Sequence, residues 1–159
     1  MKLNHKLMEN NITNLDLICV KKLLNKKNII LTQSHQVEKF ENNWSRWLNV
    51  KYSTFVNSGS SANFISIAIL KHLNKNKKKN EIIIPPLTWV SDINSIIMNG
   101  FKPVFVDINL SNLSMDINQV IKKISNKTLA VFITHAQGFN GLNDKLLKVL
   151  KKKKIHLIE

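Results

Sequence analysis

The stretch NSGSSA at residues 57–62 combines one glycine with small hydroxyl side chains, between a short apolar run and a long apolar one. If a helix begins here, its first turn presents unpaired backbone N–H groups and a partial positive charge. Gly59 would let a ligand approach the backbone closely, and Ser60 and Ser61 would add hydroxyl donors without bulk. These properties suit a phosphate group. The same residues also suit a plain helix cap, and the stretch by itself leaves both interpretations open.

A tryptophan follows another apolar run, in the segment IIPPLTWVS at residues 83–91. Pro85 and Pro86 stiffen the backbone before it, so Trp89 is expected at a fixed place beyond the end of a strand. An indole there can offer a flat apolar face to an aromatic ring, with ordinary packing as the alternative. Together with the NSGSSA stretch, Trp89 favours a planar, phosphorylated ligand.

Three further polar residues stand out, but none is predicted to be catalytic. His135 has no serine or cysteine tied to it by a recognisable nucleophile motif, so a structural or substrate-side role is expected. Asp107 is expected to bond to nearby backbone in a turn, and Asp116 is expected to cap a helix. The sequence therefore assigns no catalytic residue.

The elements that must position these residues are short β-rich runs alternating with helical patterns, which is typical of a parallel sheet. Strands are predicted at residues 53–56, 81–84, 103–106, 129–133 and 155–158. Ligands bind at the carboxyl ends of the strands in such sheets, which is where NSGSSA and Trp89 fall. The expected fold is therefore α/β, with three layers and a mostly parallel sheet flanked by helices.

The intervening helices are predicted from apolar residues spaced three and four apart. Residues 117–124, behind Asp116, and residues 90–97, before Gly100, should each lay one apolar stripe on the sheet. The helix at residues 62–73 is apolar on most sides, and it is predicted to be sandwiched and buried.

The chain before the first predicted strand has a different pattern, with helices expected near residues 17–24 and 37–48. The second of these has an aromatic face, which is expected to pack against the domain rather than to stack on a ligand. The sequence has no internal repeat and no Pro/Gly/Ser-rich linker. The predicted organisation is an N-terminal helical arm, residues 1–50, followed by an α/β domain, residues 51–159.

The net charge of +14 raises the alternative of a basic, non-enzymatic module that binds nucleic acid. Nearly all of this charge is lysine, and Arg46 is the one arginine, whereas base recognition relies on the planar guanidinium. The lysine runs at residues 75–79 and 151–154 fall in predicted loops. A solvated basic surface is therefore favoured, and nucleic acid is not expected as a partner.

Metal, disulfide and membrane functions are not expected either. Cys19 is the single cysteine, and the five histidines lack the spacing of metal ligands. No apolar run approaches the roughly 20 residues of a membrane span, and the N-terminal residues lack the apolar core of a signal peptide. A cytoplasmic location is expected.

The order of several motifs resembles the DegT/DnrJ/StrS family of pyridoxal-phosphate sugar aminotransferases, which have the aspartate aminotransferase fold (fold type I). In sequence order these motifs are LTQSHQVEKFENNW, NSGSSA, IIPPLTWVS, GFKPVFVDINLSNLSMD, ISNKTLAVFITHAQG and IHLIE. The resemblance implies that pyridoxal 5'-phosphate (PLP) is the cofactor. It further implies that Gly59, Ser60 and Ser61 bind the PLP phosphate and that Trp89 stacks on the pyridine ring.

The resemblance also implies an activity for the whole protein. That activity is transfer of an amino group, from a donor such as glutamate, to a nucleotide-linked keto-sugar, for cell-surface polysaccharide or glycan biosynthesis. Family members build each active site from two subunits, so a homodimer is implied. The alternative within the family is a PLP-dependent nucleotide-sugar 3-dehydratase, which NSGSSAN and the LTW of residues 87–89 resemble.

In the family, the residues that the chemistry requires follow the segment that matches IHLIE. They are an aspartate that pairs with the pyridine nitrogen and, later, the residue that distinguishes the two activities, which is a lysine in aminotransferases and a histidine in dehydratases. Residues 51–159 would therefore be the N-terminal part of the PLP-binding large domain, without the small C-terminal domain. The 159-residue chain is expected to be inactive by itself.

Overall fold

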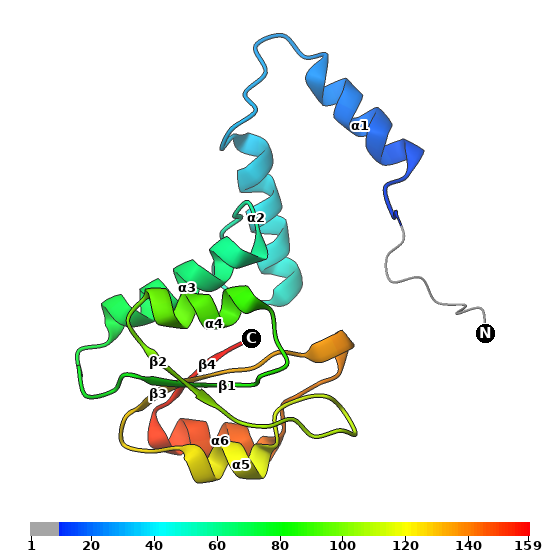
Figure 1. The fold of residues 1–159 in the computed structure, drawn as a ribbon. Helices are drawn as coiled ribbons and strands as arrows, with labels where there is room; N and C mark the ends of the chain where they lie inside the picture. Colours follow the sequence, from blue (N-terminus) through cyan, green and yellow to red (C-terminus); the bar gives the residue numbers. More distant parts are fainter. Residues whose placement is uncertain (1–9) are drawn as a thin grey trace, which may run out of the picture. The chain divides into compact units, whose positions relative to one another are not determined.

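The computed structural model describes residues 10–159 and contains two compact units, one ending at Phe55 and the other spanning Val56–Glu159 (Figure 1). The first unit holds helices α1 (Asn14–Leu24) and α2 (His35–Leu48). Side-chain oxygens cap both helices, Thr13 at the start of α1 and Ser34 at the start of α2. The two helices predicted in this part of the chain are confirmed.

Aromatic side chains on α2 pack against one another within the first unit. The ring of Trp44 lies 5.7 Å from that of Phe40 and 4.9 Å from that of Trp47. Phe55 meets Phe40 edge to face at 5.3 Å. These contacts give α2 the predicted aromatic face.

A four-stranded parallel sheet forms the centre of the second unit, with the strand order β2-β1-β3-β4. Its strands are β1 (Glu81–Ile84), β2 (Lys102–Phe105), β3 (Thr128–Phe132) and β4 (His156–Ile158). Each of the four overlaps a predicted strand. The side chains of β1 alternate between the two faces, so Ile82 and Ile84 enter one core cluster and Ile83 enters the other.

Helices cover both faces of this sheet and complete the three predicted layers. Helices α3 (Gly59–Leu73) and α4 (Val90–Met98) lie on one face, and α5 (Ile117–Lys123) and α6 (Asp144–Lys153) lie on the other (Figure 1). A short 3-10 turn, η1 (Ala136–Gly138), follows β3. The predicted α/β architecture is confirmed.

The predicted strand at residues 53–56 is wrong. This segment has no regular secondary structure and pairs with no strand in the part of the chain that the structure describes. The N–H of Phe55 donates to the Glu41 carboxylate at 2.8 Å, and the hydroxyls of Ser45 and Ser53 are 2.9 Å apart. The segment is therefore attached to side chains of α2, and the backbone N–H of Phe55 is satisfied there rather than at a sheet edge.

Two details of the predicted helices on the first face also need correction. Helix α3 buries Ile67 and Leu70, whereas Ile65 and Ile69 are about half exposed, so it is not buried on most sides. Helix α4 buries Ile96, whereas Ile97, at the end of the stripe predicted at residues 90–97, is 55% exposed. Apolar residues lie on several sides of α3, and Ile96 and Ile97 are adjacent in α4, so the pattern did not show which residues meet the sheet.

The end of α4 agrees with prediction. Gly100 has a φ of 82°, its N–H donates to the carbonyl of Ile97, and the N–H of Phe101 donates to the carbonyl of Ile96. This is a Schellman motif, with Phe101 and Ile96 in the same core cluster. Glycine is favoured here because the backbone is left-handed.

Candidate cofactor site

A pocket of about 490 Å³ lies beyond the carboxyl ends of the neighbouring strands β1 and β3. The segments that follow three strands contribute its lining residues, which are Leu87, Thr88, Trp89, Leu113, Thr134, His135, Ala136 and Gln137. This is the edge at which open parallel sheets bind ligands. Of the four residues predicted to bind a cofactor, Trp89 alone belongs to this lining.

Trp89 forms an open wall of the pocket. Its side chain is 78% exposed, and its backbone is extended immediately before α4. Its carbonyl accepts the N–H of Asp92 at 3.0 Å, which closes the first turn of the helix. Most of the indole therefore remains available to a flat ligand.

Gly59, Ser60 and Ser61 form the first turn of α3, outside the lining of the pocket. The cap of this helix is Ser58, whose hydroxyl oxygen accepts the N–H of Ser61 at 3.2 Å. Ser61 in turn donates its hydroxyl to Asn57 at 2.6 Å. Helix capping is thus performed mainly by Ser58, so it does not account for Gly59 and Ser60.

The first turn of α3 has spare hydrogen-bonding capacity. Among residues 10–159, the backbone N–H groups of Gly59 and Ser60 and the Ser60 hydroxyl have no hydrogen-bond partner. A Cβ atom added at Gly59 would meet nothing within 4 Å, so neither packing nor a left-handed backbone requires glycine there. An open helix start of this kind fits an anionic group such as a phosphate.

A side chain on α3 connects this helix to the Trp89 corner. Asn63 lies three residues after Ser60, on the same side of α3, and its amide nitrogen donates to the carboxylate of Asp92 in α4. The start of α3 is thereby fixed next to the start of α4. A phosphate at Ser60 and an aromatic ring at Trp89 fit this arrangement of the two helix starts.

The carboxylate of Asp92 is the centre of a buried polar network that the sequence did not reveal. Asp92 is 5% exposed and accepts hydrogen bonds from Thr88, Asn63 and Ser91. The hydroxyl of Thr88 is also hydrogen-bonded to that of Thr134, just beyond β3. The sequence did contain one signal for this network, an acidic residue within the pattern VSDINSII. That signal is ambiguous, because an aspartate in the first turn of a helix is also common for electrostatic reasons.

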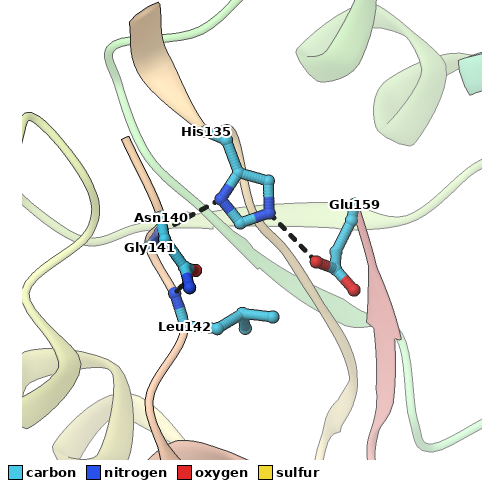
Figure 2. A network of polar contacts seen from close by, with 5 residues as sticks. All are labelled: His135, Asn140, Gly141, Leu142 and Glu159. Carbon is cyan, nitrogen blue, oxygen red and sulfur yellow. Dashed lines mark hydrogen bonds and ion pairs between the residues drawn. The ribbon is translucent and has the colours of Figure 1, made fainter. Parts of the chain in front are cut away.

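His135 holds the loop after β3 rather than a nucleophile. Its Nδ1 accepts the N–H of Gly141 at 3.0 Å, so the ring proton lies on Nε2, which is 3.0 Å from the Glu159 carboxylate (Figure 2). Among the described residues neither ring nitrogen contacts a serine or cysteine. The geometry agrees with the predicted structural role.

The two aspartates predicted to be structural are confirmed as such. The Asp107 carboxylate accepts the nearby backbone N–H of Ile108 at 2.8 Å, as predicted, although it lies next to the isolated bridge between Ile108 and Met115 rather than in a turn. Asp116 caps α5 by accepting the N–H groups of Asn118 and Gln119. The N–H of Gln119 is the main cause of a lowered pKa for Asp116, because it stabilises the charged carboxylate.

Residues 10–159 contain neither a metal-binding cluster of side chains nor a membrane-spanning helix. No group of three or more His, Cys, Asp or Glu side chains is arranged to hold a metal ion in this part of the chain. None of the described helices is both long and apolar enough to cross a membrane.

Comparison with known proteins identifies the family. The DegT/DnrJ/EryC1/StrS aminotransferase family matches residues 11–159. GDP-perosamine synthase of Escherichia coli O157:H7 is 28% identical over 130 residues, which cover 82% of this chain and 35% of that protein. GDP-4-keto-6-deoxy-D-mannose 3-dehydratase of Escherichia coli O55:H7 is 27% identical over 159 residues, which cover 99% of this chain and 40% of that protein.

A solved structure agrees with both sequence matches. It is a GDP-4-keto-6-deoxymannose-3-dehydratase with a trapped PLP-glutamate geminal diamine, and it superposes with a TM-score of 0.86 at 27% identity. The superposition covers 97% of this chain and 40% of the other. This chain therefore spans about two fifths of the length of the dehydratases it matches, and its fold is that of the PLP enzymes of fold type I. The chain belongs to the DegT/DnrJ/EryC1/StrS aminotransferase family.

Proposed function

We propose that this chain binds PLP, with the phosphate at Gly59, Ser60 and Ser61 and the pyridine ring against Trp89. The observation that carries the proposal is the Asn63–Asp92 hydrogen bond, which fixes the unfilled start of α3 beside the Trp89 wall. Among the described residues the Ser60 hydroxyl and the N–H groups of Gly59 and Ser60 are free donors that match phosphate oxygens, whereas the Ser61 hydroxyl would have to leave Asn57 to reach the phosphate. Bound PLP would supply an electron sink for reactions at the carbon next to an amino group.

For the whole protein we propose transfer of an amino group from a donor such as glutamate to a nucleotide-linked keto-sugar, within polysaccharide or glycan biosynthesis. Family membership and the match to GDP-perosamine synthase support this activity. In this proposal residues 1–50 are a helical arm, residues 51–159 are the N-terminal part of the PLP-binding large domain, and the protein is a homodimer. A cytoplasmic location is part of the proposal, supported by the single cysteine.

The second candidate is a PLP-dependent nucleotide-sugar 3-dehydratase. It is supported by the dehydratase match, which covers 99% of this chain, whereas the match to the synthase covers 82%. Both candidates use the same cofactor site, so they differ in the reaction and not in the proposed roles of Gly59, Ser60, Ser61 and Trp89.

Equilibrium dialysis with PLP tests the cofactor proposal directly. Replacing Trp89 with alanine should weaken PLP binding about tenfold, which is the upper range for an aromatic stacking contact. Trp89→Phe should retain most of the affinity because it keeps an aromatic face. Equal PLP affinity in the Trp89→Ala variant and the unmodified chain would contradict the placement of the ring, and no saturable binding would contradict the cofactor proposal itself.

The reaction is tested by incubating the protein with PLP, glutamate and a GDP-linked 4-keto-6-deoxy sugar, followed by mass spectrometry of the sugar. An amino group in place of the keto group supports the aminotransferase. Loss of the 3-hydroxyl supports the dehydratase. An unchanged sugar would show that this chain alone performs neither reaction.

A further inference from the structure

Asp92 is an acidic side chain in the interior of the second unit, and its partners come from several elements. It lies in the first turn of α4 and is 5% exposed. Its carboxylate accepts the Thr88 hydroxyl on one oxygen, and the Asn63 amide and the Ser91 hydroxyl on the other. Within residues 10–159 no lysine, arginine or histidine forms an ion pair with it. A buried carboxylate held by neutral donors alone depends on every one of those donors.

The direction of the hydrogen bonds follows from the chemistry of the groups. A carboxylate can only accept, so the Thr88 hydroxyl is the donor of its hydrogen bond to Asp92. The hydrogen bond between Thr88 and Thr134 must then be donated by Thr134. A directed chain therefore runs from Thr134, beyond β3, through Thr88, beyond β1, to α4. Asn63 extends the same network to α3.

Two hydrogen bonds to Asp92 hold the backbone around Trp89. The preceding residue, Thr88, donates its hydroxyl to the Asp92 side chain. The carbonyl of Trp89 itself accepts the backbone N–H of Asp92 at 3.0 Å. The indole is 78% exposed, so packing contacts contribute little to its orientation. The backbone on either side of the Trp89 ring is consequently the main constraint on where that ring points.

We infer that Asp92 is a positioning residue that acts through Thr88 to hold the Trp89 wall of the pocket. The inference rests on the proposed function in one respect, because it takes the PLP ring as the group that contacts Trp89. Thr134 serves as the second attachment, because it ties Thr88 to the end of the neighbouring strand. Asp92 itself does not line the pocket, so its effect on a ligand is indirect.

The first experiment measures the motion of Trp89 without any ligand. In a Trp44→Phe, Trp47→Phe background Trp89 is the one remaining tryptophan, and time-resolved fluorescence anisotropy reports its local motion. Thr88→Val, which keeps the shape but removes the hydroxyl, should increase the amplitude of the fast anisotropy decay, and Thr88→Ser should restore it. Thr54→Val, at an exposed threonine of the first unit, is the matched control and should leave the decay unchanged.

The second experiment asks whether the effect on a ligand passes through the indole. Thr88→Val should weaken PLP binding about fivefold, within the range of a stacking contact, when Trp89 is present. In a Trp89→Ala background the same substitution should have no effect, because the group being positioned is gone. Asp92→Asn should weaken PLP binding as much as Thr88→Val does, and the double variant should lose no more PLP affinity than either single variant. The control is Asp144→Asn, which changes an exposed carboxylate and should leave PLP affinity unchanged.

The outcomes separate this inference from the cofactor proposal. A change in PLP affinity that is the same with and without Trp89 would overturn the positioning role, as would an unchanged anisotropy decay in Thr88→Val. If Asp92→Asn does not fold, as judged by circular dichroism, Thr88→Val and Thr134→Val still decide the question. If PLP does not bind at all, the cofactor proposal fails, and the anisotropy experiment still tests the positioning of Trp89.

Discussion

The two ends of the parallel sheet each carry a hollow of similar size, but their linings differ. The hollow at the carboxyl end has a volume of about 490 Å³ and is lined by aromatic, hydroxyl, imidazole and apolar groups. The hollow at the amino end has a volume of about 400 Å³ and is lined by Asn76, Lys77, Lys78, Asn80, Asn126 and Lys127. Volume alone does not distinguish them. The carboxyl end is distinguished by buried polar side chains that join separate elements, Asp92 above all.

Other basic residues near the amino end, those in the last turns of helices, have a physical explanation that requires no ligand. Helices of a parallel α/β sheet end near the amino ends of the strands, and basic residues occupy the last turns of α3, α5 and α6. Positive side chains there oppose the negative end of each helix dipole. Part of the net charge of +14 therefore lies at helix ends, and the lysine run at residues 151–154 is exposed as predicted, but Lys151, Lys152 and Lys153 belong to α6 and not to the predicted loop.

The largest expected effect is a charge introduced at the carboxyl end. Gly59→Asp places a carboxylate at the start of α3, where an added Cβ meets no atom within 4 Å. The helix itself should tolerate this change, since an acidic residue in the first turn is favourable. A negative charge beside a bound phosphate should nevertheless weaken PLP binding about 100-fold, as measured by equilibrium dialysis.

The matched change at the other end of the sheet is Lys78→Glu, in the lining of the amino-end hollow. It should leave PLP affinity within about twofold, because interactions between exposed charges are screened over distances longer than about 8 Å. A strong loss of PLP affinity in Lys78→Glu, or none in Gly59→Asp, would reverse the comparison between the two ends.

The next largest effect concerns packing beneath the carboxyl-end loops. Gly141 is buried, and a Cβ atom there would lie 2.7 Å from the Ser114 hydroxyl and 3.1 Å from a methyl group of Ile133. Gly141→Ala should therefore lower the free energy of unfolding by about 2 kcal/mol in urea denaturation. Asn126→Ala, at an exposed position at the amino end, should change it by less than about 0.5 kcal/mol.

A second substitution tests the cause of the Gly141→Ala effect. The Ser114 hydroxyl is buried and has no hydrogen-bond partner among the described residues. Ser114→Gly removes both Ser114 atoms that the new methyl would meet, so adding it to Gly141→Ala should recover part of the lost stability. Ser114→Gly alone has its own cost in the free energy of unfolding. If the double variant is less stable than Gly141→Ala by that full cost, the contact between the new methyl group and Ser114 is not the cause of the Gly141→Ala effect.

The smallest effect depends on pH and concerns the cap of α5. Hydrogen bonds from the α5 backbone lower the pKa of Asp116 below its value in the unfolded chain, with the N–H of Gln119 as the main cause. The folded state therefore binds this proton less readily, so the stabilising contribution is present above the unfolded pKa and is lost as pH falls through the folded pKa. Asp116→Asn keeps the cap but removes the titration.

Thermal unfolding of the unmodified chain and of Asp116→Asn, followed from about pH 6 to about pH 2.5, measures this contribution. The difference in melting temperature between the two proteins should be constant in the upper part of this pH range and should become smaller below about pH 4. The total change should be about 3 °C or less. A difference that stays constant across the whole range would show that the Asp116 carboxyl contributes no pH dependence.

The sequence was sufficient for most of the fold because the strands of the sheet are short, apolar and separated by helical patterns. It was misleading at residues 53–56, whose composition matches that of the true strands but whose backbone and side chains bond to Ser45 and Glu41. Propensity does not reveal whether a partner strand is available. In α3 and α4 neighbouring apolar residues, such as Ile96 and Ile97, could each face the sheet, and the sequence alone does not choose between them.

For the site, the sequence indicated Trp89 and the start of α3 because glycine, small hydroxyls and an indole are distinctive beside strand ends. It did not indicate the Asp92 network, which joins residues up to 46 positions apart in the chain. Contacts of this kind depend on how elements pack and leave no local pattern. The sequence therefore indicated Trp89, which lines the pocket, but not the side chains that hold its segment in place.

The strand order also has a consequence for synthesis on the ribosome. Strand β1 is made first, β2 then adds on one side of it, β3 adds on the other side, and β4 extends the sheet beyond β3. Each new strand thus finds an existing edge to pair with as it emerges, and no strand has to be inserted between two that are already joined. The nascent chain can therefore build this sheet outward in the order of translation, with one open edge offered to each arriving strand.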